Sequence, residues 1–336
     1  MHSRDALEEG GRPLAAVVDL GTNAARLALA SLDGAGRLRS RGRHRELIRL
    51  GEGLAKAGRL SPGAFARGIA CLGRFAAIVE ERGVDLLDAV ATSALREAAD
   101  REDFLDAARA IGIPLRVIET GEEARLALAG VMAGLEPRPA RALVFDIGGG
   151  SLEIIRAEEG GLAEEGGLAE EGGPAGGGGL AEADSLPAGV VHLTERHLEE
   201  MPTPADRVEA CAAEVRALLR AIPFSAPGGE DIPLIGCGGA VALAWFIREG
   251  SAGEAGIDGT VLGADEIAGW VDRFARLGRK ERGALAGFEP GREDVALAGL
   301  IVVRELLART GAASFRVSTG GVREGRLLEL LLGEIS

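Results

Sequence analysis

The stretch VFDIGGGSLEII, from Val144 to Ile155, places one aspartate, three glycines and a serine between two apolar runs. Short apolar runs bounded by glycine predict two buried strands joined by a turn. A glycine turn at a strand end exposes backbone N–H groups, and such groups bind phosphate oxygens. Asp146 would add a carboxylate at the strand tip, which is a ligand that Mg²⁺ accepts. The stretch therefore predicts a site for phosphate and metal.

The same pattern occurs near the N-terminus, where residues 15–30 are AAVVDLGTNAARLALA. In both copies an aspartate ends an apolar run, a glycine follows two residues later and a second apolar run begins. Asp19 is the counterpart of Asp146. The repetition indicates an α/β protein with two similar domains, and 336 residues are too many for one small core.

Composition narrows the classes of function. The net charge is −14, which argues against DNA as a partner. A local basic groove could still bind a polyanion, since the Debye length is about 8 Å at physiological salt. No run of 18 uninterrupted apolar residues indicates a membrane span, and the polar N-terminus has no apolar signal core. Three scattered cysteines favour neither disulfides nor zinc. We expect a cytoplasmic protein without a membrane partner.

Local signals place several elements between the two copies. Residues 32–39, LDGAGRLR, contain an Asp-Gly turn followed by a polar strand. Ser61 as N-cap and Pro62 at the first helical position predict a helix that continues to Arg82. A glycine-rich, acidic repeat of six residues covers 158–175. Its period is too short for a solenoid unit, so we expect a loop expansion without a catalytic part.

Glycine turns follow four predicted strands, and we expect them to contact phosphate. Single turns of this type are common, but four of them, two with an adjoining aspartate, favour phosphate binding over turn geometry alone. The four turns are Gly21-Thr22-Asn23, Gly148-Gly149-Gly150-Ser151, Gly236-Cys237-Gly238-Gly239 and Ser318-Thr319-Gly320-Gly321.

Acids and arginines near other strand ends extend the candidate site. Glu122 and Glu123 begin a predicted helix, where a capping role is common and a general-base role is the alternative. Arg96 and Arg26 follow turns and could bind phosphate through two hydrogen bonds each. Ser93 lies beside Arg96 at a predicted strand-to-helix junction.

Seven motifs together resemble the exopolyphosphatase / guanosine pentaphosphate phosphohydrolase (Ppx/GppA) family. Their order and spacing match over about residues 15–335, nearly the full chain. The motifs are DLGTNAARL, ATSALREA, ETGEEARLALAGV, DIGGGSLEI, SLPAGVVHLTERHL, GCGGAVALA and STGGVREGRLLELL.

The resemblance implies a fold of two ribonuclease-H-like domains of the actin-like ATPase superfamily around a central cleft. The first domain would span residues 1–133 and be completed by a C-terminal helix at 322–336. The second would span 134–321, with the low-complexity loop at 158–180. The chain resembles the short members of the family, which lack the further helical domains of the long ones.

The resemblance also implies roles for the candidate residues. Glu122 becomes the expected general base, with Glu123 as the next candidate, and Arg96 the expected phosphate ligand at the reacting group. Asp146 and Glu153 match positions around the metal, and Asp19 joins them in the expected set. Mg²⁺ or another divalent cation is the implied cofactor.

Two positions depart from the family pattern. Ala24 replaces a serine in the motif DLGTNAARL, and Leu152 replaces a threonine in the motif DIGGGSLEI. Each change removes a hydroxyl that we expect near the phosphates, and a lost donor to a charged group costs about 1.5–3 kcal/mol. The carboxylates and glycines are retained, so we expect an active enzyme.

These observations predict a bacterial-type phosphohydrolase that releases terminal orthophosphate from polyphosphate by in-line attack of water. Guanosine pentaphosphate is the alternative substrate, although aromatic residues make up only 3% of the chain and no base-stacking pocket is evident. An ATP-dependent kinase of the same superfamily and a non-catalytic sensor of polyphosphate or an alarmone are further alternatives. A homodimer is left open.

Overall fold

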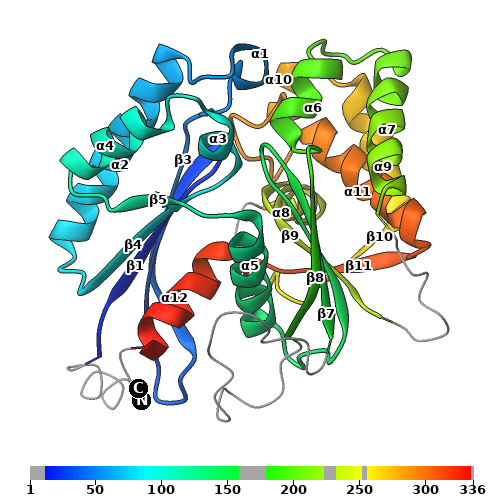
Figure 1. The fold of residues 1–336 in the computed structure, drawn as a ribbon. Helices are drawn as coiled ribbons and strands as arrows, with labels where there is room; N and C mark the ends of the chain where they lie inside the picture. Colours follow the sequence, from blue (N-terminus) through cyan, green and yellow to red (C-terminus); the bar gives the residue numbers. More distant parts are fainter. Residues whose placement is uncertain (1–11, 159–178, 223–231, 252–255, 334–336) are drawn as a thin grey trace. The chain divides into compact units, whose positions relative to one another are not determined.

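The computed structural model describes residues 12–158, 179–222, 232–251 and 256–333. The low-complexity repeat at 159–175 lies outside these residues. The chain divides into two compact units, residues 1–119 with 322–336 and residues 120–321. Each unit contains one mixed sheet with helices packed against it (Figure 1). The structure therefore confirms the α/β class, with one mixed sheet in each of the two units.

Unit 1 is built on a five-stranded sheet in the order β3-β2-β1-β4-β5. Strands β1, β2 and β3 form an antiparallel meander, and β4 and β5 continue the sheet in parallel with β1. Its strands are β1 (Ala15–Leu20), β2 (Ala24–Leu32), β3 (Leu38–Leu47), β4 (Leu86–Ala91) and β5 (Leu115–Val117). Its helices are α1 (Leu54–Ala57), α2 (Pro62–Glu81), α3 (Ser93–Glu97), α4 (Arg101–Ala110) and α12 (Val322–Gly333).

Two apolar layers cover the faces of this sheet. Leu27 and Leu29 of β2 belong to a core with α2 and α4, whereas Ala28 and Ala30 pack with Leu327 of α12. This alternation follows the two-residue period of a strand. Helix α2 begins as its sequence signals predict, because Ser61 caps it by accepting from the N–H of Ala64 at 3.1 Å.

Helix α2 is long and apolar enough, by length and composition alone, to cross a membrane. It is the one such helix among the described residues. One of its faces packs in the unit 1 core through Leu72 and Phe75. Core helices of soluble proteins pass the same test, so the feature is weak evidence for a membrane span.

Unit 2 is built on a six-stranded sheet in the order β10-β11-β9-β6-β7-β8. Its strands are β6 (Ala142–Ile147), β7 (Leu152–Glu158), β8 (Gly179–Leu186), β9 (Leu234–Gly238), β10 (Val261–Gly263) and β11 (Ser314–Val317). Its helices are α5 (Thr120–Gly134), α6 (Val190–His197), α7 (Ala205–Arg220), α8 (Gly239–Glu249), α9 (Ala264–Arg276), α10 (Arg279–Gly283) and α11 (Ala296–Thr310).

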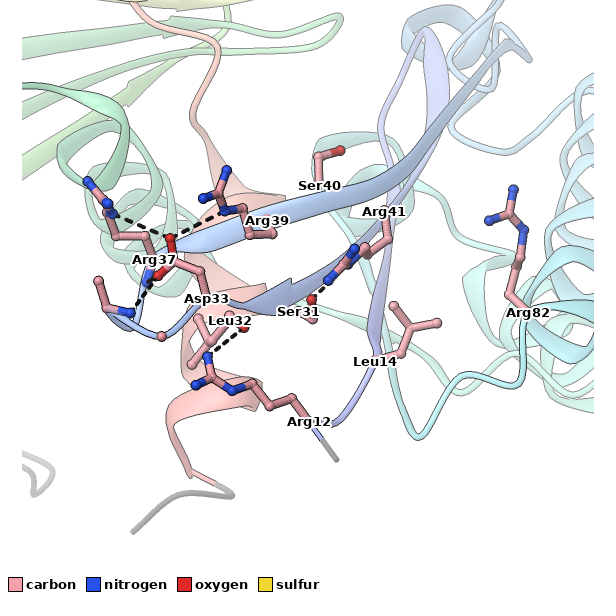
Figure 2. Close-up of a pocket in the computed structure, with 12 residues that line it drawn as sticks. Arg12, Leu14, Ser31, Leu32, Asp33, Arg37, Arg39, Ser40, Arg41 and Arg82 are labelled. Atoms are coloured by element: carbon pink, nitrogen blue, oxygen red, sulfur yellow. Dashed lines mark hydrogen bonds and ion pairs between the residues drawn. The ribbon is translucent and has the colours of Figure 1, made fainter. Parts of the chain in front are cut away.

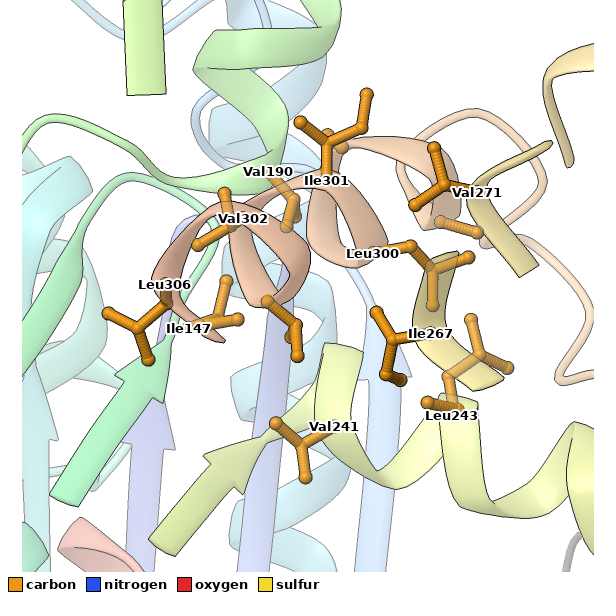
Figure 3. Close-up of a cluster of buried hydrophobic side chains, with 14 of the residues drawn as sticks. Ile147, Val190, Val241, Leu243, Ile267, Val271, Leu300, Ile301, Val302 and Leu306 are labelled. Carbon is orange, nitrogen blue, oxygen red and sulfur yellow. The ribbon is translucent and has the colours of Figure 1, made fainter. Parts of the chain in front are cut away.

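Helix α11 is the centre of the unit 2 core. It is apolar on nearly all sides and contacts α6, α7, α8 and α9. Figure 3 shows Leu300, Ile301 and Val302 pointing to different neighbours, with Ile267 of α9 and Val241 of α8 among them. A helix that is hydrophobic all round requires burial on all sides, and this core provides it.

The division of the chain differs from the expected boundary after residue 133, because α5 lies in unit 2. Helix α5 packs against β7 and β8. It also meets the turn at Gly320 and Gly321 so closely that a Cβ atom on Gly130 would overlap the carbonyl oxygen of Gly321. The polar end of this helix, with Glu122 and Glu123, is therefore attached to the second sheet.

This close contact yields a stability prediction. Replacing Gly130 with alanine should lower the free energy of unfolding by about 1–3 kcal/mol, because the new methyl group overlaps backbone atoms that cannot rotate away. Gly269→Ala in α9 is the matched control, since that position faces open space and alanine favours helix by roughly 0.5–1 kcal/mol. Urea denaturation of both variants measures the difference. Equal stability of the two variants would contradict the packing role.

Candidate active site

The first glycine turn joins β1 to β2 in unit 1. The N–H group of Gly21 donates to the carbonyl of Ala24 at 3.0 Å, which closes the turn. Asp19 lies directly opposite Arg26 across the strand pair, and its Oδ2 atom is 3.7 Å from Arg26 Nη1. The aspartate in this copy therefore already has a cationic neighbour.

A loop after β3 fixes the first turn and was not predicted as part of the site. The carbonyl of Asn23 accepts from the N–H groups of Ile48 and Arg49 at 3.1 and 2.9 Å, and the carbonyl of Thr22 accepts from Gly51 at 2.9 Å. Arg49 has a φ of 50°, in the left-handed region that non-glycine residues rarely adopt. The sequence signal that could have revealed this loop is the RLGEG stretch at 49–53.

Ser93 and Arg96 lie at the same sheet edge as Asp19. Leu20 pairs with Ala91 in the parallel β1–β4 ladder, so both strands end side by side. Ser93 donates from Oγ to Glu97 at 2.7 Å, and Arg96 donates from Nη1 to the carbonyl of Ile118 at 2.9 Å. The sheet thus brings together the predicted unit 1 residues from β1, β2 and the start of α3.

The second glycine turn joins β6 to β7 in unit 2, and its carbonyl groups are bound by helix α6. The N–H groups of residues 189–191 donate to the carbonyls of Gly150, Gly148 and Gly149 at 3.2, 3.1 and 2.8 Å. Within the part of the chain that the structure describes, the N–H groups of Gly149 and Gly150 donate to no protein acceptor. These amides are the ones that could hold phosphate oxygens.

Two carboxylates face each other beside this turn. Asp146 on β6 pairs directly with Glu153 on β7, and side chains in such pairs lie on one face of the sheet. Glu153 is only 2% exposed and accepts from Ser185 Oγ at 3.1 Å. Burial raises the pKa of Glu153, and the charges of Glu123 and Asp146 raise it further, to about 8. Hydrogen bonds from Ser151 and Ser185 act in the opposite direction.

Glu122 and Glu123 differ in their surroundings although they are consecutive. Glu123 is buried and lies close enough to Glu153 to shift its pKa, whereas Glu122 is half-buried. Neighbouring residues on a helix point about 100° apart, so one faces the sheet and the other turns away from it. Glu123 therefore lies beside the pair of carboxylates formed by Asp146 and Glu153, and Glu122 is the more accessible carboxylate of the two consecutive glutamates.

The third glycine turn adjoins Asp146. Gly238 pairs with Ile147 and has a φ of 88°, and a Cβ atom there would overlap Asp146 Oδ1. Arg292, which sequence reasoning missed, is buried and donates from Nη1 to the carbonyl of Gly239. A Cβ atom on Gly239 would lie 2.6 Å from Arg292 Nη2. Glycine at 238 and 239 thus lets both side chains approach the turn.

The fourth turn serves packing. A Cβ atom on Gly320 would overlap the carbonyl oxygen of Gly130 in α5. The N–H of Gly320 donates to Ser318 Oγ at 3.1 Å, and the N–H of Thr319 donates to Asp258 Oδ1 at 2.5 Å. Protein acceptors bind these amides, so the expected phosphate role of Gly320 has no support from its contacts.

The two departures from the family pattern also have different surroundings. Leu152 is fully buried in the unit 2 core, so this side chain fills apolar space instead of facing the turn. Ala24 is buried at the start of β2, and its carbonyl accepts the hydrogen bond that closes the first turn. The structure therefore gives no reason to expect that Leu152 removes a phosphate contact.

Comparison with known structures gives the class of protein. The fold is similar to the crystal structure of an exopolyphosphatase-like protein, with a TM-score of 0.84 and 29% identity over 97% of this chain and 99% of that chain. It is also similar to the Aquifex aeolicus member of the Ppx/GppA family, with a TM-score of 0.75 and 26% identity over 97% and 100% of the two chains.

The chain belongs to the Ppx/GppA phosphatase family, whose model matches residues 33–334. It is 32% identical over 339 residues to exopolyphosphatase 2 of Mycobacterium tuberculosis. That match covers 94% of this chain and 98% of the relative. The family predicted from the seven motifs is confirmed.

The pKa of Glu153 yields a prediction for stability against pH. Glutamate has its ordinary pKa near 4.5 in the unfolded chain and about 8 in the folded one, so the folded protein retains a proton that the unfolded chain releases. Stability of the metal-free protein should therefore fall as pH rises from about 5 to about 8. Glu153→Gln should remove this trend. Between about pH 5 and pH 8, the free energy of unfolding of the variant should therefore rise by roughly 2–4 kcal/mol relative to that of the wild type.

Urea denaturation at several pH values, with a chelator present, measures this difference. Glu158→Gln is the matched control, because Glu158 lies on the same strand with its side chain 55% exposed. We expect the control to follow the wild type. A difference between Glu153→Gln and the wild type that stays constant with pH would contradict the prediction.

Proposed function

We propose that this protein is an exopolyphosphatase, which hydrolyses the terminal phosphoanhydride bond of inorganic polyphosphate and releases orthophosphate. The observation that carries the proposal is the joint occurrence of family membership and an acid-flanked glycine turn with available amides in unit 2. The exopolyphosphatase 2 relative supports polyphosphate as the substrate class.

The carboxylates of unit 2 fit a divalent cation. Asp146 and Glu153 supply the oxygen ligands that Mg²⁺ prefers, and a cation would offset the repulsion among these two carboxylates and Glu123. Among the described residues no three acidic, histidine or cysteine side chains converge as a complete metal site. One or two carboxylates with water and substrate oxygens would therefore hold the ion, and Asp19 remains a proposed further ligand. When bound, the cation would supply neutralising charge for phosphoryl oxygens.

The protein's own residues would carry the remaining roles. Glu122 would accept a proton from the water that attacks the terminal phosphorus, because it is the accessible carboxylate of its pair. The amides of Gly149 and Gly150, and the guanidinium group of Arg96, would bind phosphoryl oxygens. Supporting positions in the proposal are Gly21, Thr22, Asn23, Arg26, Ser93, Gly148, Ser151, Gly238 and Gly239.

The substrate class is tested by measuring phosphate release on long polyphosphate, tripolyphosphate and guanosine pentaphosphate, with and without Mg²⁺. We expect release from polyphosphate that depends on the metal. Release from guanosine pentaphosphate alone would replace the proposal with the alarmone reaction. Tight binding of polyphosphate without release would identify a sensor.

The base assignment makes a separate prediction. Glu122→Gln should lower kcat about 10²–10⁴-fold, because amide cannot accept the proton, and should leave polyphosphate affinity nearly unchanged. Glu119→Gln is the matched control: it removes the same charge from an exposed position three residues earlier and should retain activity. If Glu122→Gln keeps near-normal turnover, the role passes to Glu123.

A further inference from the structure

Unit 1 contains a groove of about 1010 Å³ at the end of its sheet away from the first glycine turn. The β2–β3 hairpin forms one side, and the residues before β1 and after α2 complete it (Figure 2). Leu14 lines the groove directly before β1, and Asp19 lies five residues further along this strand. The two positions are therefore separated by about 17 Å along the strand.

The charge of the groove is opposite to that of the protein. The whole chain has 52 acidic and 38 basic residues, but the described residues that line the groove include one aspartate and five arginines. The charged lining residues are Arg12, Asp33, Arg37, Arg39, Arg41 and Arg82. Like charges that gather in a concave surface attract a ligand of the opposite sign.

Asp33 organises the hairpin and stays ionised. It accepts from the N–H groups of Ala35 and Arg37, both at 2.9 Å, and lies 3.5 and 3.3 Å from the Nε atoms of Arg37 and Arg39. The hydrogen bond from the Arg37 amide is the main reason that its pKa is lowered. One carboxylate thus positions two of the arginines and offsets only part of the positive charge of the lining.

A β-bulge lies in β3 at the groove. The register shifts between Leu29 and Ala30, so Arg39 pairs with Ser31 and the extra residue is Arg41. Arg41 then donates from Nε to Ser31 Oγ at 2.9 Å. Arg12 is held on the same hairpin by a bond from Nη1 to the carbonyl of Leu32 at 3.0 Å. These bonds hold both guanidinium groups on the hairpin.

The lining selects among polyanions. The described residues that line it include no aromatic side chain, whereas proteins that bind single-stranded nucleic acid stack bases on aromatic rings. It is concave, which suits a chain that lies in it better than a flat membrane surface. Arginine binds phosphoryl oxygens through two parallel hydrogen bonds. An extended chain of phosphoryl groups without bases meets all three conditions.

We propose that this groove binds an internal segment of a long polyphosphate chain, at a distance from the end that is hydrolysed. The inference rests on the proposed function, which supplies the substrate. A chain held here keeps its other parts near the protein, so its end returns to the reactive groups at a raised effective concentration. Tripolyphosphate is too short to span the separation from Asp19 and gains nothing from the groove.

The test compares Arg41→Ala/Arg82→Ala with the wild type on long polyphosphate and on tripolyphosphate. We expect KM for the long chain to rise about tenfold, as the loss of two exposed charge contacts would give, with kcat unchanged. Both parameters should be unchanged for tripolyphosphate. Arg41→Lys/Arg82→Lys should restore part of the affinity, because it keeps the charge but not the paired hydrogen bonds. Arg101→Ala/Arg109→Ala on α4 is the matched control, removing two exposed charges elsewhere in unit 1.

Four outcomes would overturn the proposal: no change with the long chain, an equal rise in KM for both substrates, an equal effect of the control variant, or no rescue by lysine. Equilibrium binding of end-labelled long polyphosphate, followed by fluorescence anisotropy, separates this proposal from the proposed function. If the wild type has no phosphatase activity but Arg41→Ala/Arg82→Ala binds long polyphosphate more weakly than the wild type, the proposed function is disproved and the groove proposal stands. If the wild type is active and the variant binds long polyphosphate as tightly as the wild type, the groove proposal is disproved and the proposed function stands.

Discussion

The pairing register of β6 and β7 is the constraint on which the candidate site depends. It sets Asp146 directly opposite Glu153 and buries the second carboxylate within the sheet. Like charges opposite each other destabilise a strand pair, and burial of a carboxylate adds a desolvation cost. Serines at 151 and 185 reduce this cost without removing it. The fold therefore maintains an arrangement that becomes favourable when a cation or a proton is present, and this is the electrostatic condition that a metal-dependent phosphatase needs.

Packing around the glycine turns holds this arrangement in place. The first turn of α6 binds the carbonyls of the Gly148–Gly150 turn, and α6 in turn contacts α11 at the centre of the core. A Cβ atom on Gly189 would overlap Gly150, so this contact requires glycine at position 189. The turn is thus bound from its carbonyl side, and the amides of Gly149 and Gly150 are left available to a ligand. The hydrogen bonds from residues 189–191 thus fix the turn to the core and leave two of its N–H groups available as donors.

Sequence patterns predicted those parts of the protein that local chemistry determines. Ser61 and Pro62 marked the start of α2, and the Asp–Gly–apolar pattern marked both hairpins, because caps and turns depend on neighbouring residues. The assignment of α5 to unit 2 and the packing role of Gly320 were not predictable in this way. They arise from contacts between Gly130 and the turn at Gly320 and Gly321, which lies 190 residues further along the chain. Arg292 was missed for the same reason, since its partner Gly239 lies 53 residues away.

The two copies of the repeated hairpin differ at one informative position. The seventh residue after the aspartate is Arg26 in the first copy and Glu153 in the second, and each lies directly opposite its aspartate. Asp19 is therefore paired with a protein cation, whereas Asp146 faces another acid. The same backbone geometry thus places a cation opposite the aspartate in one copy and a second carboxylate opposite it in the other. Because a divalent cation gains most where carboxylates repel one another, the second hairpin is the better candidate to hold the proposed metal. The first hairpin, with Arg26 beside its glycine turn, has the charge suited to direct contact with phosphoryl oxygens.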